Sequence, residues 1–181
     1  MLSLAITLCI VTGTMTFALA GQAPPAEYQV KAAFVYNFLT FVEWPSRTLN
    51  EADSLRVCIA GEFPDAAAFD ELNGQELMGR KLTVRRMKSV ENAQGCHVLF
   101  IGSSEGGRLS RLVESLKGSG TLTIGDTTGF AQRGVVINLY IDQKKVRFEI
   151  NAEAARRAGL IISSKLLKLA GVVYGLAPAG N

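Results

Sequence analysis

Residues 96–102 read CHVLFIG, a run in which four apolar side chains follow one another without a polar break before a glycine. Such a run is typical of a strand buried on both faces of a parallel sheet. Strand and helix patterns alternate on either side of it, in the order 55–61, 64–72, 81–87, 96–102, 107–117 and 121–124. This alternation predicts an α/β fold with a mostly parallel sheet and right-handed crossovers.

Beyond Gly129 the pattern changes to two strands, 135–141 and 145–150, separated by a short polar turn. Strands so closely spaced predict a C-terminal antiparallel hairpin. Its second arm alternates, so that three apolar residues face the core and three charged ones face water or a partner. The inward set is Val146, Phe148 and Ile150, and the outward set is Lys145, Arg147 and Glu149.

Capping residues place two flanking helices after the hairpin. Asn151 is an N-cap for a short helix that Gly159 ends, and Ser163 or Ser164 caps the last helix. The chain contains no internal repeat and no linker long enough to divide it. We therefore expect a single compact domain.

A long helix is predicted over 26–43, entered through Pro24 and Pro25 and stopped by Pro45. Apolar residues surround it almost completely, with only a narrow polar strip. A helix of this kind must be covered on both faces. It is either central to the core or shares a surface with another chain.

Residues 1–20 carry no charged side chain and are largely apolar, which predicts a cleavable export signal. Cleavage is expected between Ala20 and Gly21, with a competing position after Ala23, so that residues 21–181 form the mature domain. The alternative is an uncleaved membrane anchor, because about twenty apolar residues can span a bilayer. We do not expect stable membrane insertion after cleavage.

Export leaves Cys58 and Cys96 as the mature chain's two cysteines. An even count in an oxidising compartment favours a disulfide bond. The alternative is a pair of buried free thiols, which are common in protein cores.

The composition fits one ordinary folded domain, with 181 residues, 48% hydrophobic residues and a net charge of +3. That surplus is too small and too dispersed for a nucleic-acid-binding face. We expect no nucleic-acid partner.

The residues 102–106, GSSEG, fit a nucleophile-elbow pattern around Ser104. The single histidine, His97, precedes this serine, whereas the elbow fold requires one that follows it. The same loop lacks the Lys and Ser or Thr of a phosphate-binding loop. One histidine and two distant cysteines also make no zinc site. We expect no catalytic residue, metal or cofactor, although the amides at this helix start could hold an anion weakly.

Two long blocks carry a resemblance to a known family. Residues 27–45, EYQVKAAFVYNFLTFVEWP, and residues 129–170, which begin GFAQRGVVINLYIDQKKVRFEIN, are similar to the two signatures of the YfiR family of exported bacterial proteins. The spacing of Cys58 and Cys96 also fits. Val135 departs from the pattern, since many members have a second glycine there, and the chain lacks the C-terminal cysteine pair of some members.

The resemblance implies a periplasmic repressor that binds the periplasmic part of an inner-membrane diguanylate cyclase and thereby restrains cyclic-di-GMP synthesis and biofilm formation. It also implies a compact α/β domain that can form a homodimer. For the partner surface we chose aromatic and charged residues, because such residues dominate binding energy at interfaces. They are Phe34, Phe38, Phe41, Trp44, Arg147 and Glu149. The alternative for each aromatic residue is core packing.

Two other functions compete with repression. The first is a periplasmic small-ligand sensor that uses the loop 102–108 or the hairpin edge and acts without a cyclase. The second is an exported hydrolase whose nucleophile is Ser104.

Overall fold

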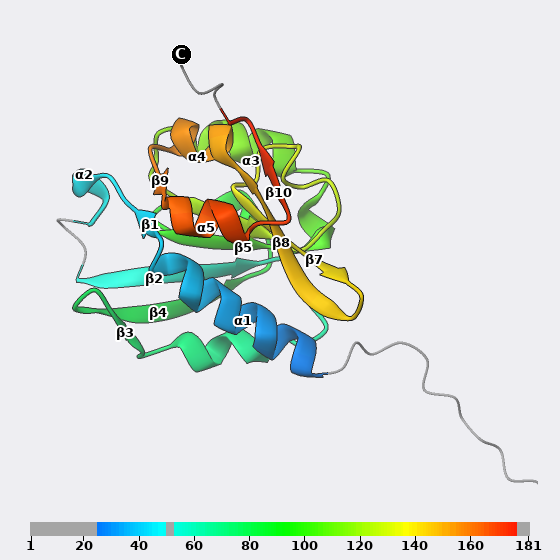
Figure 1. Ribbon diagram of the computed structural model, residues 1–181. Helices are drawn as coiled ribbons and strands as arrows, with labels where there is room; N and C mark the ends of the chain where they lie inside the picture. The colour runs from blue at the N-terminus through cyan, green and yellow to red at the C-terminus, as the bar shows by residue number, and fades with distance from the viewer. Residues whose placement is uncertain (1–24, 50–52, 177–181) are drawn as a thin grey trace, which may run out of the picture.

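An eight-stranded sheet runs through the centre of the molecule and is flanked by helices (Figure 1). The structure is a computed structural model that describes residues 25–49 and 53–176. The expected α/β fold is confirmed, with a mostly parallel central sheet, an antiparallel hairpin and flanking helices.

The longer helices and strands lie close to the expected segments, although the helix expected over 64–72 is a 3-10 helix and several short elements were not expected. In chain order they are α1 (Pro25–Leu39), β1 (Val42–Glu43), α2 (Ser46–Leu49), β2 (Ser54–Ala60), η1 (Ala66–Leu72), β3 (Glu76–Leu77), β4 (Arg80–Met87), η2 (Val90–Asn92), β5 (Val98–Ile101), η3 (Ser103–Glu105), α3 (Leu109–Ser115), β6 (Leu122–Gly125), β7 (Ile137–Asp142), β8 (Lys145–Asn151), α4 (Ala152–Ala158), β9 (Ile161–Ile162), α5 (Ser164–Leu169) and β10 (Val172–Tyr174).

The main sheet has the order β10-β8-β7-β6-β5-β2-β4-β3. Its central strands, from β4 to β7, are parallel to one another. Strand β8 returns antiparallel to β7, and β10 pairs parallel to β8. The strand order reverses between β2 and β5, which makes their carboxyl ends the topological switch point of the sheet.

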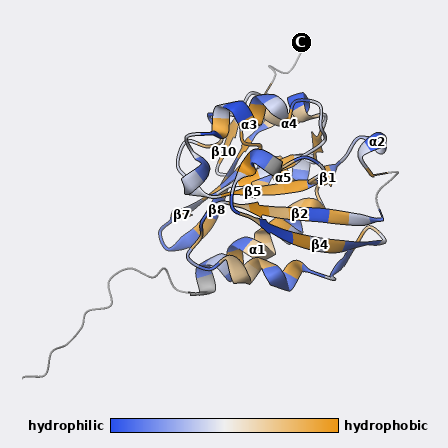
Figure 2. Cartoon of the chain, turned by 180° about the vertical axis from the view of Figure 1, so that it is seen from behind, coloured by the Kyte–Doolittle hydropathy of each residue, from blue (hydrophilic) through white to orange (hydrophobic). Residues whose placement is uncertain are grey.

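The sheet separates two hydrophobic cores, and Figure 2 shows how apolar its central strands are. Alternate residues of one strand serve the two faces. In β2, Val57 and Ile59 enter the larger core with α1, whereas Cys58 and Ala60 enter the smaller core with α3. Burial of both faces explains the unbroken apolar run of β5.

Helix α1 ends at Leu39, four residues before the expected end at Glu43. The amides of Thr40 and Phe41 bond three residues back, to the carbonyls of Asn37 and Phe38, and the chain then enters strand β1. Strand β1 pairs antiparallel with β9 in a separate two-stranded sheet. The sequence pattern missed this change because the apolar periodicity continues through it.

The helix caps expected in the C-terminal part of the chain are confirmed. The Asn151 side chain accepts a hydrogen bond from the Ala154 amide, and Gly159 ends α4 in the left-handed conformation with φ of 82°. The Ser163 side chain caps α5 by accepting from the Leu166 amide. Strand β10 was not expected, because its apolar residues continue the helical pattern of the preceding segment.

Candidate partner-binding groove

A groove lies between α1 and the tip of the β7–β8 hairpin, and we call it the α1–hairpin groove. It encloses about 580 Å³. Its lining residues are Glu27, Val30, Phe34, Ile141, Lys144, Lys145 and Val146. Val30 is 42% exposed and Ile141 is 49% exposed, so the groove presents apolar surface to solvent. Exposed apolar surface bordered by polar groups is typical of an interaction site.

The hairpin fold brings the second wall into place. Gln143 and Lys144 both have positive φ, at 47° and 62°, as a tight two-residue hairpin turn requires. Ile141 and Val146 are then cross-strand partners. They lie on the face of the hairpin toward α1, because Phe148, two residues beyond Val146, packs 5.0 Å from Phe38 between ring centroids.

A buried ionic cluster fixes the N-terminal half of α1 beside this groove. The Lys31 ammonium lies 2.8 Å from an Asp126 carboxylate oxygen and 2.7 Å from a Glu27 carboxylate oxygen. The Tyr28 hydroxyl donates a hydrogen bond to Asp126. Burial, followed by the charge of Asp126, raises the pKa of Tyr28 above its ordinary value. Tyr28 therefore stays a neutral donor at physiological pH.

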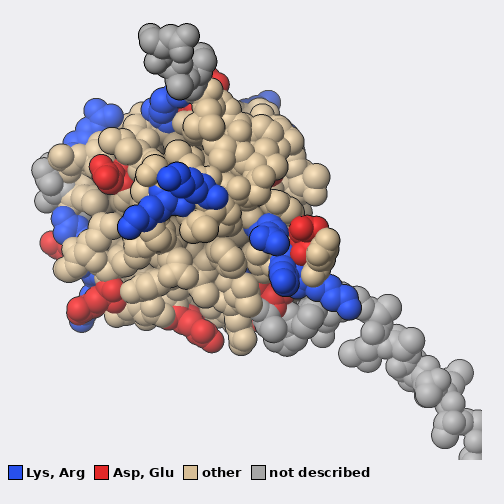
Figure 3. All heavy atoms as spheres, in the orientation of Figure 1, with Lys and Arg blue, Asp and Glu red and all other residues tan. Residues whose placement is uncertain are grey.

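Charge is distributed unequally on the two walls. Glu27 is engaged by Lys31, whereas Lys144 and Lys145 are exposed and make no ion pair within the described residues. Asp142 is the cross-strand neighbour of Lys145 and carries one opposing charge. Figure 3 shows basic and acidic groups side by side over the hairpin tip.

The predicted aromatic residues divide between the groove and the core. Phe34 lines the groove and Phe41 is half-buried against the larger core. Phe38 is 1% exposed and Trp44 is 9% exposed, so both pack inside this chain. For Phe38 and Trp44 the structure therefore shows the core-packing alternative.

The two predicted hairpin residues point away from α1. Arg147 is exposed, and alternation from Phe148 places it on the opposite face of the sheet from Phe34. Glu149 is 9% exposed, so the expectation that it faces outward is wrong. Its carboxylate accepts hydrogen bonds from the Asn138 amide and the Tyr174 hydroxyl. Strand β10, which the sequence pattern does not predict, lies beside β8 and supplies Tyr174.

The predicted disulfide bond between Cys58 and Cys96 is confirmed, with a Cα–Cα distance of 5.9 Å. It joins the middle of β2 to the turn before β5, across a separation of 38 residues. Both cysteines belong to the smaller core, on the face of the sheet away from α1. The bridge and the α1–hairpin groove are thus on opposite faces.

The switch point, where ligands usually bind in sheets of this kind, is filled by side chains. The Phe63 ring packs against Gly102, so closely that a Cβ there would lie 2.9 Å from the ring. The Ser104 hydroxyl accepts a hydrogen bond from the Glu62 amide. This packing gives Ser104 a structural role in joining the two loops.

The side chain of His97 has a structural role within the sheet. Its Nδ1 accepts a hydrogen bond from the Arg56 amide at 2.9 Å, which requires the neutral ring. Burial, followed by the nearby charge of Arg56, lowers the pKa of His97 below its ordinary value of 6.5. Its imidazole lies in a strand connection rather than beside Ser104.

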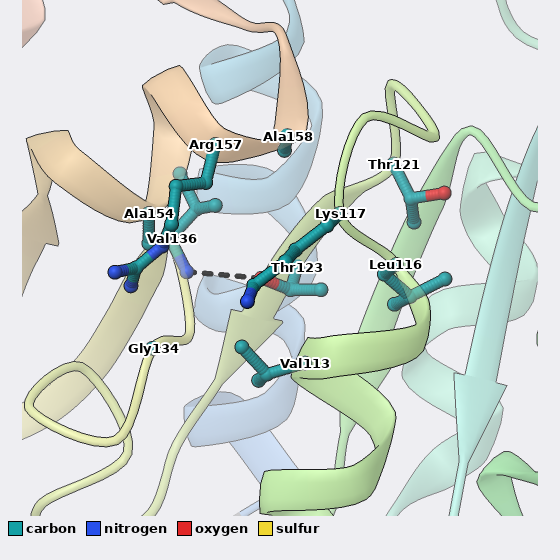
Figure 4. Close-up of a pocket in the computed structure, with 10 residues that line it drawn as sticks. All are labelled: Val113, Leu116, Lys117, Thr121, Thr123, Gly134, Val136, Ala154, Arg157 and Ala158. Atoms are coloured by element: carbon teal, nitrogen blue, oxygen red, sulfur yellow. Dashed lines mark hydrogen bonds between the residues drawn. The ribbon is translucent and has the colours of Figure 1, made fainter.

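A second hollow lies between the end of α3 and helix α4 (Figure 4). Lys117 and Arg157 approach it from opposite walls, and the Thr123 hydroxyl below accepts a hydrogen bond from the Val136 amide. The hollow encloses about 20 Å³, roughly enough for one water molecule. It is too small for a metabolite.

A third hollow, of about 430 Å³, lies at the carboxyl ends of β2 and β4. Arg86 and Lys88 are among its lining residues. Arg86 is paired with Asp70 at 2.5 Å, which neutralises part of the basic character of this hollow. The α1–hairpin groove is larger and more apolar in its exposed lining residues.

The family model described as DUF4154, YfiR/HmsC-like, matches residues 28–171. The chain belongs to the YfiR/HmsC-like family. The match includes α1, the main sheet up to β8 and the segment to α5. Membership in the YfiR/HmsC-like family fits a periplasmic regulator that works through a protein partner.

A solved structure resembles this fold at low sequence identity. It is a crystal structure of a conserved domain protein from Vibrio cholerae O1 biovar El Tor, with a TM-score of 0.52 and 14% identity. The similarity covers 81% of this chain and 60% of that chain. It shows the fold alone.

The remaining predictions concern the membrane, metals and the leader. No helix among residues 25–49 and 53–176 is long and apolar enough to cross a bilayer. The same residues contain no group of three or more His, Cys, Asp or Glu that could hold a metal ion. Ala20, Gly21 and the rest of the predicted export signal lie outside the described residues.

Proposed function

We propose that this protein is an exported, non-catalytic regulator that binds the periplasmic part of an inner-membrane diguanylate cyclase and holds the cyclase inactive. Cyclic-di-GMP signalling and biofilm formation are restrained as a result. The observation that carries the proposal is the α1–hairpin groove, an apolar surface on a chain of the YfiR/HmsC-like family. The disulfide bond supports the periplasmic location, because such bonds persist in oxidising compartments.

The interaction surface in this proposal centres on Phe34 and Val30 of α1 together with Ile141 of the hairpin. Phe41 is half-buried against the larger core and does not line the groove. Phe38 and Trp44 support it from within the core, and Glu149 holds the hairpin base through Asn138. Arg147 is exposed on the other face of the hairpin and lies outside this surface.

Repression follows from differential affinity. A regulator that binds the inactive conformation of its partner more tightly than the active one shifts the partner toward the inactive state. The shift cannot exceed the ratio of the two affinities. Loss of the apolar contacts in the groove makes the two affinities equal. The regulator then no longer favours the inactive state, and the cyclase is released.

The test measures cyclic-di-GMP in a strain that lacks the gene. Deletion is expected to raise the nucleotide, and the intact gene is expected to lower it again. The variant Val30→Asp with Ile141→Asp places two charges in the groove and is expected not to restore repression, because each buried apolar side chain contributes roughly 1.5–3 kcal/mol.

The matched control is Ile161→Asp, which changes another exposed apolar residue, on β9 outside the groove lining. It is expected to restore repression fully. Unchanged cyclic-di-GMP in the deletion strain contradicts the proposed function. Equal repression by the groove variant and the control contradicts the proposed surface.

A further inference from the structure

We infer that the outer edge of β8 near the hairpin tip pairs with an extended segment of the partner protein in which acidic and apolar residues alternate. This edge consists of residues 145–148, and we call it the β8 edge. The inference rests on the proposed function only for the identity of the protein that carries the segment. The chemistry of the segment follows from the backbone groups and side chains that the β8 edge presents.

The β8 edge has a neighbouring strand on one side only. Strand β7 pairs with all four of its residues, from Lys145 opposite Asp142 to Phe148 opposite Leu139. On the other side, β10 pairs with β8 only from Glu149 onward. Within residues 25–49 and 53–176, no strand therefore lies beside the outer side of the β8 edge.

Backbone groups of two residues point toward this unpaired side. The two-residue turn makes Asp142 and Lys145 a hydrogen-bonded pair, so the backbone groups of Val146 and Phe148 point away from β7. The Gly171 amide donates to the Phe148 carbonyl at 2.9 Å, which agrees with this direction. The amide and carbonyl of Val146 and the amide of Phe148 are left outside any strand pairing of the described residues. An extended segment can bond these groups as an added strand.

The side chains of the β8 edge define the sequence of that segment. Lys145 and Arg147 are exposed on one face and make no ion pair within the part of the chain that the structure describes. Val146 points to the other face and lines the α1–hairpin groove. Residues directly opposite one another on neighbouring strands share a face and interact. The segment therefore carries Asp or Glu beside the two basic residues and an apolar residue beside Val146.

The two basic residues also decide between the possible occupants. Two β8 edges paired around a two-fold axis would bring Lys145 and Arg147 of both copies together, and like charges on neighbouring strands are destabilising. Charged side chains on an exposed edge are a common protection against such pairing. An acidic segment replaces this repulsion with attraction, so the charges select a different protein rather than a second copy.

The opposite edge of the hairpin suits an acidic segment less well. Strand β7 is also unpaired on its outer side beyond Asn138. Its remaining residues include Asp142 and no basic residue. The amide of Ile141, which points outward from β7, therefore serves as an internal reference for binding at the β8 edge.

The first experiment adds a model peptide to the isotope-labelled mature protein and follows the backbone amides by NMR. The probe is acetyl-Glu-Val-Glu-Val-Glu-Val-amide, and the control peptide has the same residues in two blocks, Glu-Glu-Glu-Val-Val-Val. The probe is expected to shift the amide signals of Val146 and Phe148 and to slow their hydrogen exchange, without changing Ile141. Unchanged signals at Val146 and Phe148, a response at Ile141 instead, or an equal response to the control peptide overturns the inference.

The second experiment reverses the charges of the β8 edge. Lys145→Glu with Arg147→Glu is expected to weaken binding of the probe about tenfold, because each change replaces an attraction with a repulsion. A probe with Lys in place of Glu is expected to bind this variant better than the unchanged protein. The matched control is Lys165→Glu with Lys168→Glu, two exposed residues of α5, which is expected to leave affinity unchanged. Equal affinity of the two variants for the acidic probe overturns the inference.

The third experiment removes a backbone donor. Val146→Pro deletes the outward amide and leaves the hydrogen bonds to β7 in place, as proline on an edge strand allows. It is expected to abolish the response of Phe148 to the probe. The control Val172→Pro deletes the outward amide of β10, and denaturation curves check that both variants fold. Equal binding by both proline variants overturns the inference, and the charge reversal tests it independently because it changes only exposed side chains.

The proposed function fails by a different result, an unchanged cyclic-di-GMP level in the deletion strain. A rise in that level together with no binding of the probe would overturn the inference alone.

Discussion

Lys31 shows how one side chain can secure a whole helix. Its ammonium is buried, with 5% of the side chain exposed, and Asp126 opposite is 7% exposed. Removing one member of a buried pair leaves an uncompensated charge. The pair therefore fixes α1 to the end of β6, beside the groove, more firmly than any of the exposed pairs of this chain.

We predict that Asp126→Ala lowers the free energy of unfolding by about 2 kcal/mol, less than for an isolated buried pair, because Lys31 keeps the Glu27 carboxylate at 2.7 Å. Chemical denaturation of the purified protein measures the change. Glu114→Ala is the matched control, because its pair with Lys117 is 69% and 48% exposed and is expected to change stability by at most about 0.5 kcal/mol. Similar small changes in both variants would contradict the role assigned to Asp126.

His97 gives a prediction about pH. Because burial lowers its pKa in the folded state, the folded protein binds a proton less readily than the unfolded chain does. The neutral ring's contribution to the free energy of unfolding is full above pH 6.5. It is lost as the pH falls from there toward the pKa of the folded state. Since the chain has one histidine, its imidazole NMR signal can be followed without ambiguity, and its midpoint is expected below 6.5.

The same titration in denaturant is the control and is expected to give a midpoint near 6.5. A folded midpoint at or above 6.5 would show that the Arg56 amide does not hold the neutral ring. In that case protonation of His97 would not lower the stability of the folded protein as the pH falls.

At the residue scale, the sequence predicted local hydrogen bonds better than it predicted which side chains are buried. The caps at Asn151 and Ser163 need only neighbours along the chain, and both are confirmed. Alternation predicts an outward position for Glu149, but Glu149 is buried, and its carboxylate is bonded by Asn138 and by Tyr174 of β10. Which residues are covered depends on contacts from distant segments, and a single sequence does not show them.

At the element scale, the disulfide bond joins β2 to the turn before β5 within the smaller core. It closes a loop of 38 residues in the unfolded chain. A cross-link of this span stabilises a fold by about 4 kcal/mol in the chain-entropy model.

We predict that Cys58→Ala with Cys96→Ala lowers the free energy of unfolding by about 4 kcal/mol. A reducing agent is expected to destabilise the unchanged protein by a similar amount and to leave the double variant unaffected. Denaturation curves with and without dithiothreitol measure both effects. A response of the double variant to the reductant would point to another cause.

Elements with strong local patterns were predicted, and short elements that depend on distant pairing were not. The apolar run of β5 and the alternation of β8 are visible in the sequence. Strands β1 and β9 have two residues each and exist only through their mutual pairing. Strand β10 forms beside β8, and its three residues resemble the end of a helix in sequence. The strand that contains Ile141 was predicted, but its position opposite α1 depends on how the hairpin packs against that helix.

At the scale of the whole molecule, the predicted export signal would decide where the protein works. We predict that protein from the periplasmic fraction begins at Gly21, or at Pro24 if cleavage follows Ala23. N-terminal sequencing distinguishes these outcomes. Ala18→Arg is the control that blocks processing, because signal peptidase requires a small residue there. An intact chain beginning at Met1 in the membrane fraction would favour the uncleaved anchor.

The whole architecture was predictable to the level of an α/β domain with a terminal hairpin. The partner surface was predicted only in part, since Phe34 lines the groove while Phe38 and Trp44 are interior. Aromatic residues in one helix look alike in sequence, and their separation depends on how the hairpin packs against that helix. Arg147 was grouped with them by residue type, although the sheet places it on the other side.

The position of the cystine on the far side of the sheet has a consequence for how the envelope's redox state acts on this molecule. A layer of strands insulates the sulfur atoms from the surface where a partner would dock. Reductants that enter the periplasm would therefore shorten the lifetime of the folded protein. They would do so before they changed the affinity of the remaining folded protein for its partner. Thiol chemistry would therefore regulate the amount of folded protein rather than its affinity for the partner.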